Sequence, residues 1–166
     1  MKEPRAPSAP PTPRLPAWSG LAGRFVVGLV LVISGSMKAA APPEEFSIVI
    51  EGYQLLRSQD LILMLATFMP WAEVVLGFAL IFGYLTRAAA ASAGALLLVF
   101  IGALLSAKAR GLYLPNCGCF GAGFHPTPLM AIGIDAVLVG FALLAYRSGT
   151  LILSLDNWCG EGYTKR

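Results

Sequence analysis

The chain has 166 residues, of which 57% are hydrophobic and only 13% are charged, about half the charged share of an ordinary soluble domain. Its length allows one domain, and its three cysteines are too few for a disulfide-rich secreted scaffold. The net charge of +3 is small and spread along the chain, which gives no support to nucleic-acid binding. The composition therefore predicts a membrane protein in contact with a lipid bilayer.

Four apolar runs are long enough to cross that bilayer. A helix needs about 20 mostly apolar residues to span, and backbone groups in lipid must be paired within the segment. We therefore expect an all-α four-helix transmembrane domain over residues 21–147, between a Pro-rich disordered tail (1–20) and a C-terminal tail (148–166). The expected spans are 21–41, 61–85, 88–107 and 128–146.

The first run has a second interpretation as a signal peptide with a cleavage site at Ala39-Ala40-Ala41. The segment ahead of it is longer and richer in proline than an ordinary n-region, which favours a retained helix.

Basic residues predict the orientation of the four spans. With the N-terminus in the cytoplasm, eight lysines and arginines lie inside and four lie outside, which favours a multi-pass protein of the bacterial inner membrane with both termini cytoplasmic. The inner set is Lys2, Arg5, Arg14, Arg24, Arg87, Arg147, Lys165 and Arg166, and the outer set is Lys38, Arg57, Lys108 and Arg110.

The connector between the first two spans, residues 42–60, has helical periodicity. Glu44 and Glu45 follow Pro42-Pro43, where acidic residues suit the start of a helix. Apolar residues then recur at helical spacing: Phe46, Val49, Ile50, Tyr53 and Leu56. We expect a short extracytoplasmic amphipathic helix that lies on the membrane surface, packs its apolar side on the bundle, or does both.

Besides Arg24 near the start of the first run, three charged residues fall within the apolar runs. Glu73, three residues after Pro70, is expected to face the bundle interior, either as a proton acceptor or quinone contact or as a structural group paired with a neighbour such as Lys38. Lys38 is expected to extend toward the membrane surface, with an inward turn toward an acid as the alternative. Asp135 is expected to make an inward-facing hydrogen bond, and it lies where it could modulate the loop that precedes its helix.

That loop carries the sequence Cys117-Gly118-Cys119-Phe120-Gly121. A disulfide between thiols one residue apart closes a small ring with awkward geometry, and strain makes such a bond easier to reduce than a structural one. The predicted orientation places this pair outside the cytoplasm, where disulfides persist. Cys159 falls on the opposite side of the membrane and is not expected to join it.

His125 is the only histidine and follows Cys119 by six residues. With Cys117 and Cys119 it would supply three soft ligands for Cu(I) or Zn(II), but a fourth ligand is missing and no metal is predicted. His125 fits better as a cap for the fourth span, with a redox partnership to the thiols as the alternative.

Together these residues resemble the MauE/DoxX family of small bacterial membrane proteins, over residues 21–147. The resemblance rests on Arg24 and Phe25, Ser34-Gly35-x-x-Lys38, Tyr53, Pro70-x-x-Glu73-x-x-x-Gly77, Arg87, and Cys117-Gly118-Cys119-Phe120-Gly121. It implies a four-helix bundle similar to membrane oxidoreductases that pass electrons between thiols and quinones. Its methylamine-utilisation branch implies support for a periplasmic thioredoxin-like partner, or for maturation of a periplasmic enzyme.

We therefore expect a redox-associated membrane protein, a component of a thiol–disulfide oxidoreductase system. Its redox pair would be Cys117 and Cys119, with Glu73 as a proton or quinone contact. The sequence identifies no cofactor with certainty, although a quinone is a candidate. Quinone-linked thiol oxidases generally use Cys-x-x-Cys and a second outer pair, which this chain lacks, and this departure argues against an autonomous relay to a quinone. The alternative is a non-catalytic membrane subunit or assembly factor whose loop disulfide is structural.

Overall fold

The computed structural model describes residues 17–112 and 127–148, and the regular secondary structure in this part of the chain is all helical. Its elements are α1 (Ala17–Ala40), α2 (Pro43–Gly52), α3 (Gln59–Phe82), α4 (Thr86–Ala109) and α5 (Pro128–Ser148). The four long helices are each long and apolar enough to span a membrane, and the short α2 lies between the first two. The predicted fold class is confirmed.

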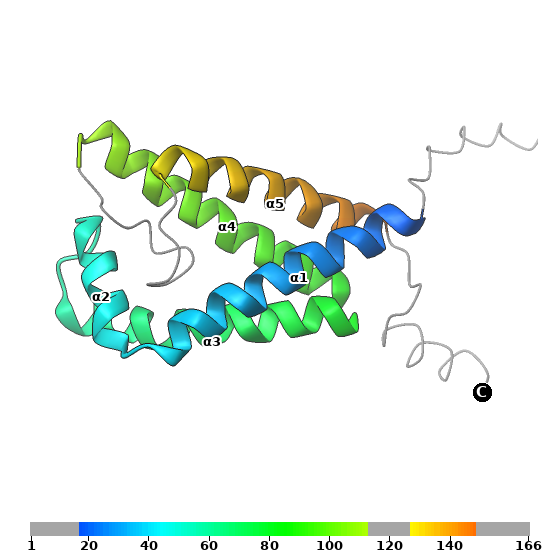
Figure 1. Ribbon diagram of the computed structural model, residues 1–166, viewed down its shortest axis with the longest axis horizontal. Helices are drawn as coiled ribbons and strands as arrows, with labels where there is room; N and C mark the ends of the chain where they lie inside the picture. The colour runs from blue at the N-terminus through cyan, green and yellow to red at the C-terminus, as the bar shows by residue number, and fades with distance from the viewer. Residues whose placement is uncertain (1–16, 113–126, 149–166) are drawn as a thin grey trace, which may run out of the picture.

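The long helices form an elongated bundle with α2 at one end (Figure 1). We call this the α2 end. α1 packs against α3 and α5, α4 packs against α5, and α2 packs mainly against α3. The start of α1 and the end of α5 lie at the opposite end of the bundle, as does the turn between α3 and α4.

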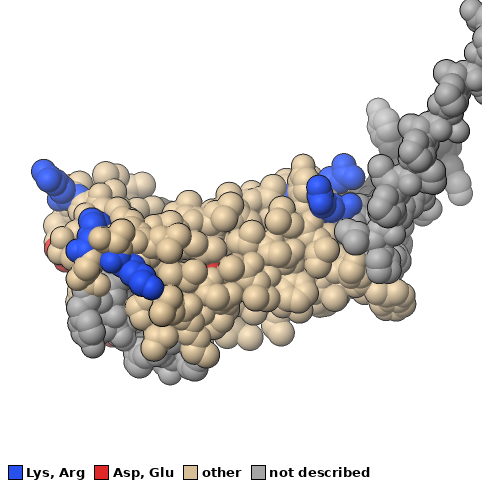
Figure 2. All heavy atoms as spheres, turned by 90° about the horizontal axis from the view of Figure 1, so that it is seen from above, with Lys and Arg blue, Asp and Glu red and all other residues tan. Residues whose placement is uncertain are grey.

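Charge on the surface follows the same axis. On the face shown in Figure 2, lysine and arginine side chains gather near the two ends, with a broad and almost uncharged band between them. The long helices expose many large apolar side chains, such as Leu98, Val99 and Phe68. In water such a surface would be unfavourable, but it suits contact with lipid.

Close contact between α1 and α3 depends on glycine. A Cβ atom on Gly28 would lie 2.8 Å from the Gly77 carbonyl oxygen, and one on Gly77 would lie 2.7 Å from the Gly28 oxygen. About two turns further along α1, a Cβ on Gly35 would lie 2.7 Å from the Pro70 oxygen and 2.9 Å from Cβ of Glu73. Small residues allow helix backbones to approach in lipid, and here they bring the two helices together on both sides of Glu73.

α4 uses alanine for the same purpose. Ala89, Ala90 and Ala93 are buried in a cluster that also contains Ala142 and Ala145 of α5. The alanine-rich start of α4 is thus a packing surface, as small residues commonly are between helices in lipid.

At the α2 end, the connector contains a helix that is shorter than the apolar pattern suggested. α2 finishes at Gly52, and Gln54 adopts a left-handed conformation with φ 51°. The guanidinium of Arg110, just after α4, donates hydrogen bonds to the carbonyl oxygens of Tyr53 and Gln54. α2 turns Phe46 into the bundle and leaves Ile48 exposed, so the packing interpretation of its apolar side is supported for Phe46.

Candidate functional site

Among the described residues, four ionisable side chains are buried inside the bundle: Arg24, Lys38, Glu73 and Asp135. A charged group in a bilayer interior is costly unless it is paired or neutralised, and such residues commonly mark functional sites. Three of the four gather in one place, and they define the candidate site.

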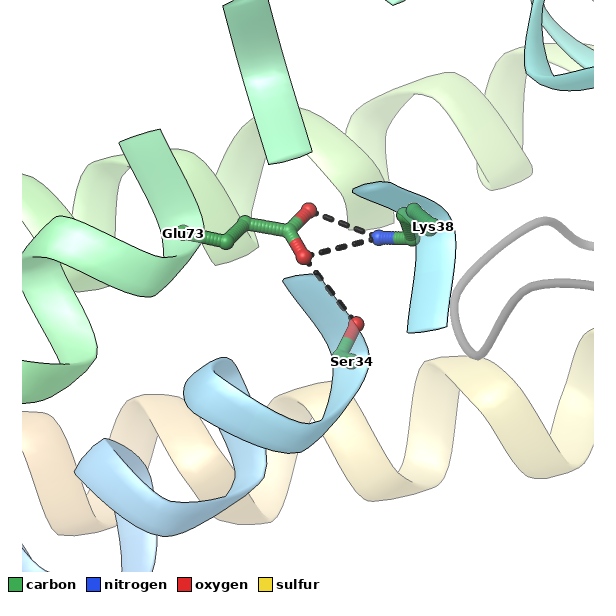
Figure 3. A network of polar contacts seen from close by, with 3 residues as sticks. All are labelled: Ser34, Lys38 and Glu73. Atoms are coloured by element: carbon green, nitrogen blue, oxygen red, sulfur yellow. Dashed lines mark hydrogen bonds and ion pairs between the residues drawn. The ribbon is translucent and has the colours of Figure 1, made fainter. Parts of the chain in front are cut away.

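Lys38 of α1 and Glu73 of α3 form a buried ion pair (Figure 3). Lys38 Nζ donates to Glu73 Oε1 at 2.6 Å and to Oε2 at 3.0 Å, and the two side chains are 1% and 0% exposed. Ser34, one turn before Lys38 on α1, donates its hydroxyl to Glu73 Oε2 at 3.0 Å. Both carboxylate oxygens of Glu73 are therefore paired, in charge-assisted hydrogen bonds.

The expectation that Lys38 extends to the membrane surface is wrong. Its ammonium group turns inward to Glu73 and also lies 5.3 Å from the ring centre of Phe46 and 5.1 Å from that of Phe100. These distances are typical of cation–π contacts, which are stronger where water is excluded. The ion-pair alternative for Glu73 is the one that the structure shows.

Asp135 of α5 faces inward, as expected, and is 4% exposed. Its Oδ2 atom accepts no hydrogen bond from the described residues, so the expected pairing is not seen for this atom. Asp135 lines a cavity of about 20 Å³ that is also lined by Ser34, Glu73 and Phe100. α1, α3 and α5 each therefore contribute a polar side chain to the wall of one small cavity.

Arg24 lies at the other end of α1 and belongs to a different set of contacts. Its Nε donates to the Leu80 carbonyl oxygen at 3.1 Å, and its Nη2 contacts the Ile81 oxygen at 3.4 Å. These carbonyls are in the last turn of α3, where a cation complements the helix dipole. Arg24 thus holds the start of α1 against the end of α3, a role that its position in the sequence did not indicate.

A larger, apolar pocket lies beside the ion pair. Its volume is about 240 Å³, and its walls come from α2, α3, α4 and the turn after α2. Phe46 and Phe100, the two rings that flank Lys38, are part of this wall. The remaining lining residues are Ile50, Tyr53, Leu55, Leu56, Leu65, Met69, Val99 and Ala103.

Cys117, Cys119, His125 and Cys159 lie outside the described residues. The segment that carries the first three joins α4 to α5, and both of these helix ends are at the α2 end of the bundle. At the start of α5, the Thr127 hydroxyl accepts a hydrogen bond from the Met130 amide at 3.4 Å, so Thr127 contributes a cap there. Residues 17–112 and 127–148 contain no cluster of three or more side chains suited to bind a metal.

Comparison with known proteins identifies a family for the chain. The model of the family described as "Methylamine utilisation protein MauE" matches residues 16–148, which include all five helices. No curated protein and no solved structure matches the chain.

Proposed function

The chain belongs to the MauE family, and from this premise we propose that it is an inner-membrane protein of methylamine utilisation that exchanges thiols and disulfides with an extracytoplasmic partner. The observation that carries the proposal is the Cys117-Gly118-Cys119 sequence in the segment between α4 and α5. Membrane spans and family membership agree with this role, and the thiol chemistry is inferred from the cysteine spacing.

The chemistry follows from the strain of a small disulfide ring. A thiolate of the partner attacks one sulfur of the Cys117–Cys119 disulfide, which gives a mixed disulfide and one free thiolate on this chain. The second thiolate of the partner then resolves the mixed disulfide, so that the partner is oxidised and Cys117 and Cys119 are both reduced. The reverse sequence transfers the disulfide back, and the relative potentials set the direction.

The proposed orientation places the α2 end outside the cytoplasm. The basis is the excess of lysine and arginine at the opposite end and in the two chain tails. An extracytoplasmic partner, such as a periplasmic thioredoxin-like protein or another membrane subunit, would then meet the cysteine segment from that side.

A quinone is the cofactor that the apolar pocket supports. A cavity of roughly 150 Å³ holds benzene, so the 240 Å³ pocket is large enough for a substituted ring. Its position against Phe46 and Phe100 would place such a ring near the Lys38–Glu73 pair. Glu73 would then contribute a carboxylate close to the proton-accepting oxygens of a quinone, which is the quinone contact predicted from the sequence.

The thiol proposal is tested by Cys117→Ser and Cys119→Ser in cells that depend on methylamine for growth. Each variant should insert normally and fail to support growth, and one should accumulate a reductant-sensitive mixed disulfide because the remaining thiol has lost its resolving partner. Cys159→Ser is the matched control and should grow normally. If both serine variants support growth, and the wild-type pair stays oxidised in strong reductant, the disulfide is structural and the chain is an assembly factor or non-catalytic subunit.

The quinone proposal is tested separately by Ala103→Phe, which fills the pocket. Purified protein in lipid nanodiscs is given a dithiol and a short-chain quinone, and quinol formation is followed by absorbance. Ala103→Phe should abolish a rate that the wild type shows. Leu105→Phe, on the same helix but facing lipid, is the control. Equal rates in all three proteins, or no wild-type rate, would exclude transfer of electrons to a quinone in this pocket.

A further inference from the structure

Asp135 has an unusual environment for a carboxyl group. It is almost fully buried, and its Oδ2 accepts no hydrogen bond from residues 17–112 or 127–148. It lines the 20 Å³ cavity whose other polar walls are Ser34 and Glu73. An ionised carboxylate with an unpaired oxygen in such a place is strongly unfavourable, so the carboxyl group is expected to bind a proton and become neutral.

The charges around Asp135 do not balance. Among the residues that the structure describes, Lys38 is the one buried cation beside the two carboxyl groups, Glu73, with which it pairs, and Asp135, which shares a cavity with Glu73. Arg24 precedes Lys38 by 14 positions on α1, roughly 21 Å along the helix axis, and is bound to the last carbonyls of α3. The described part of α4 buries no charged side chain, and the acidic side chains of α2 (Glu44, Glu45 and Glu51) are exposed. One negative charge is therefore left over inside the bundle.

We propose that Asp135 is a membrane-buried proton-binding site, which shares one water molecule with Ser34 and Glu73. A water molecule needs a cavity of about 10–15 Å³ and two to four polar partners. The cavity of about 20 Å³ has room for one, and Asp135, Glu73 and Ser34 supply the partners. The bound proton removes the excess negative charge, and the water gives it a path between the two carboxyl groups.

The proton belongs on Asp135 because the two carboxyl groups are solvated differently. Glu73 receives two hydrogen bonds from Lys38 and one from Ser34, all of which favour its ionised form. Asp135 has no such donor at Oδ2. The site binds and releases its proton as a coupled unit of Asp135, Glu73 and Lys38. This inference concerns only these three helices and does not depend on the thiol proposal.

Infrared spectroscopy of the full chain in lipid nanodiscs tests the site directly, since a protonated carboxyl group has a C=O stretch that a carboxylate lacks. At neutral pH, where exposed carboxyl groups are ionised, the wild type should show the band of one protonated carboxyl group. The band should shift when the protein is labelled with ¹³C-aspartate at the side-chain carboxyl carbon, and it should not shift with ¹³C-glutamate. Absence of the band, or a shift with labelled glutamate alone, would overturn the proposal.

Variants then test the charge balance. Asp135→Asn should remove the band, and so should Glu73→Gln, because Asp135 is then the carboxyl group left at the cavity to balance the charge of Lys38. Lys38→Met should double the band, because two carboxyl groups then lack a cation. Asp60→Asn, at the exposed start of α3, is the control and should leave it unchanged. A band that survives Asp135→Asn, or that does not grow in Lys38→Met, contradicts the proposal. If a variant fails to fold, the labelling of the wild type decides the proposal by itself.

Discussion

Lys38 and Glu73 are 35 residues apart in the chain, yet Lys38 Nζ lies 2.6 Å from Glu73 Oε1, and both side chains are buried inside the bundle. The approach is possible because Gly35 lies against Pro70 and Glu73, and Gly28 lies against Gly77. The glycines and the ion pair thus form a single structural arrangement between α1 and α3.

Substitution of Gly77 should separate the two helices. In Gly77→Ala, the new methyl group would lie 2.7 Å from the Gly28 oxygen and from Cγ2 of Val32. Overpacking of this kind costs about 1–3 kcal/mol, so the melting temperature in detergent should fall. Gly102→Ala on α4 is the control, because its Cβ meets nothing within 4 Å, and it should leave stability unchanged or raise it slightly. Equal effects of the two substitutions would show that the close contact does not limit stability.

Removal of one partner of the ion pair should cost more than removal of both. Lys38→Met leaves Glu73 without a cation in the interior, and breaking a buried pair in this way costs about 3–5 kcal/mol. The double variant Lys38→Met/Glu73→Leu replaces both charges with apolar groups and should recover most of that loss. Unfolding in denaturant measures the difference, with Lys108→Met at the exposed end of α4 as the control. The idea fails if the double variant is as unstable as Lys38→Met alone.

Arg24 should stabilise the bundle without contributing to the site. In Arg24→Met, the Leu80 and Ile81 carbonyl oxygens lose the guanidinium as a donor, while the Gly83 amide still donates to the Leu80 oxygen, and we expect a loss of about 1–3 kcal/mol. Arg147→Met, near the end of α5 and exposed, should have little effect. The infrared band assigned to Asp135 should be the same in both variants; a changed band would mean that Arg24 acts on the site electrically.

The orientation can be measured by labelling single cysteines with a membrane-impermeant maleimide. In a background with the three native cysteines changed to serine, Arg57→Cys and Lys108→Cys should be labelled from outside intact cells. Arg87→Cys should be labelled only after the membrane is permeabilised. All three positions are exposed in the fold, so accessibility depends on the side of the membrane. The reverse pattern would place the cysteine segment in the cytoplasm and remove the basis of the thiol proposal.

The sequence was sufficient to predict the spans, because length and hydropathy are local properties. Each predicted run overlaps its helix, and the largest difference is at α1, which begins at Ala17 rather than at residue 21. The inward position of Glu73 was predicted for a similar reason, since a carboxyl group in mid-span has few other places to go.

The partners of Glu73 were harder to predict because they depend on how α1 sits against α3. Lys38 is close to the end of its helix, where a long side chain can reach the membrane surface, and local sequence alone favours that outcome. The glycine contacts and the rings of Phe46 and Phe100 decide otherwise. The contacts of Arg24 with the end of α3 were not predicted, because an arginine early in an apolar run resembles a charge at the membrane boundary. The roles of Cys117 and Cys119 stay predictions, since these residues lie outside the described part of the chain.

The buried ion pair also has a consequence for biosynthesis. When α1 leaves the ribosome, Glu73 has not yet entered the membrane, so Lys38 has no counter-charge there and is stable only at the lipid–water boundary. α3 faces the same difficulty with Glu73 if α1 is not beside it. Each helix alone therefore bears the cost of an unpaired charge in the bilayer. In the α1–α3 pair, which the glycines allow to close, Lys38 and Glu73 remove that cost for each other.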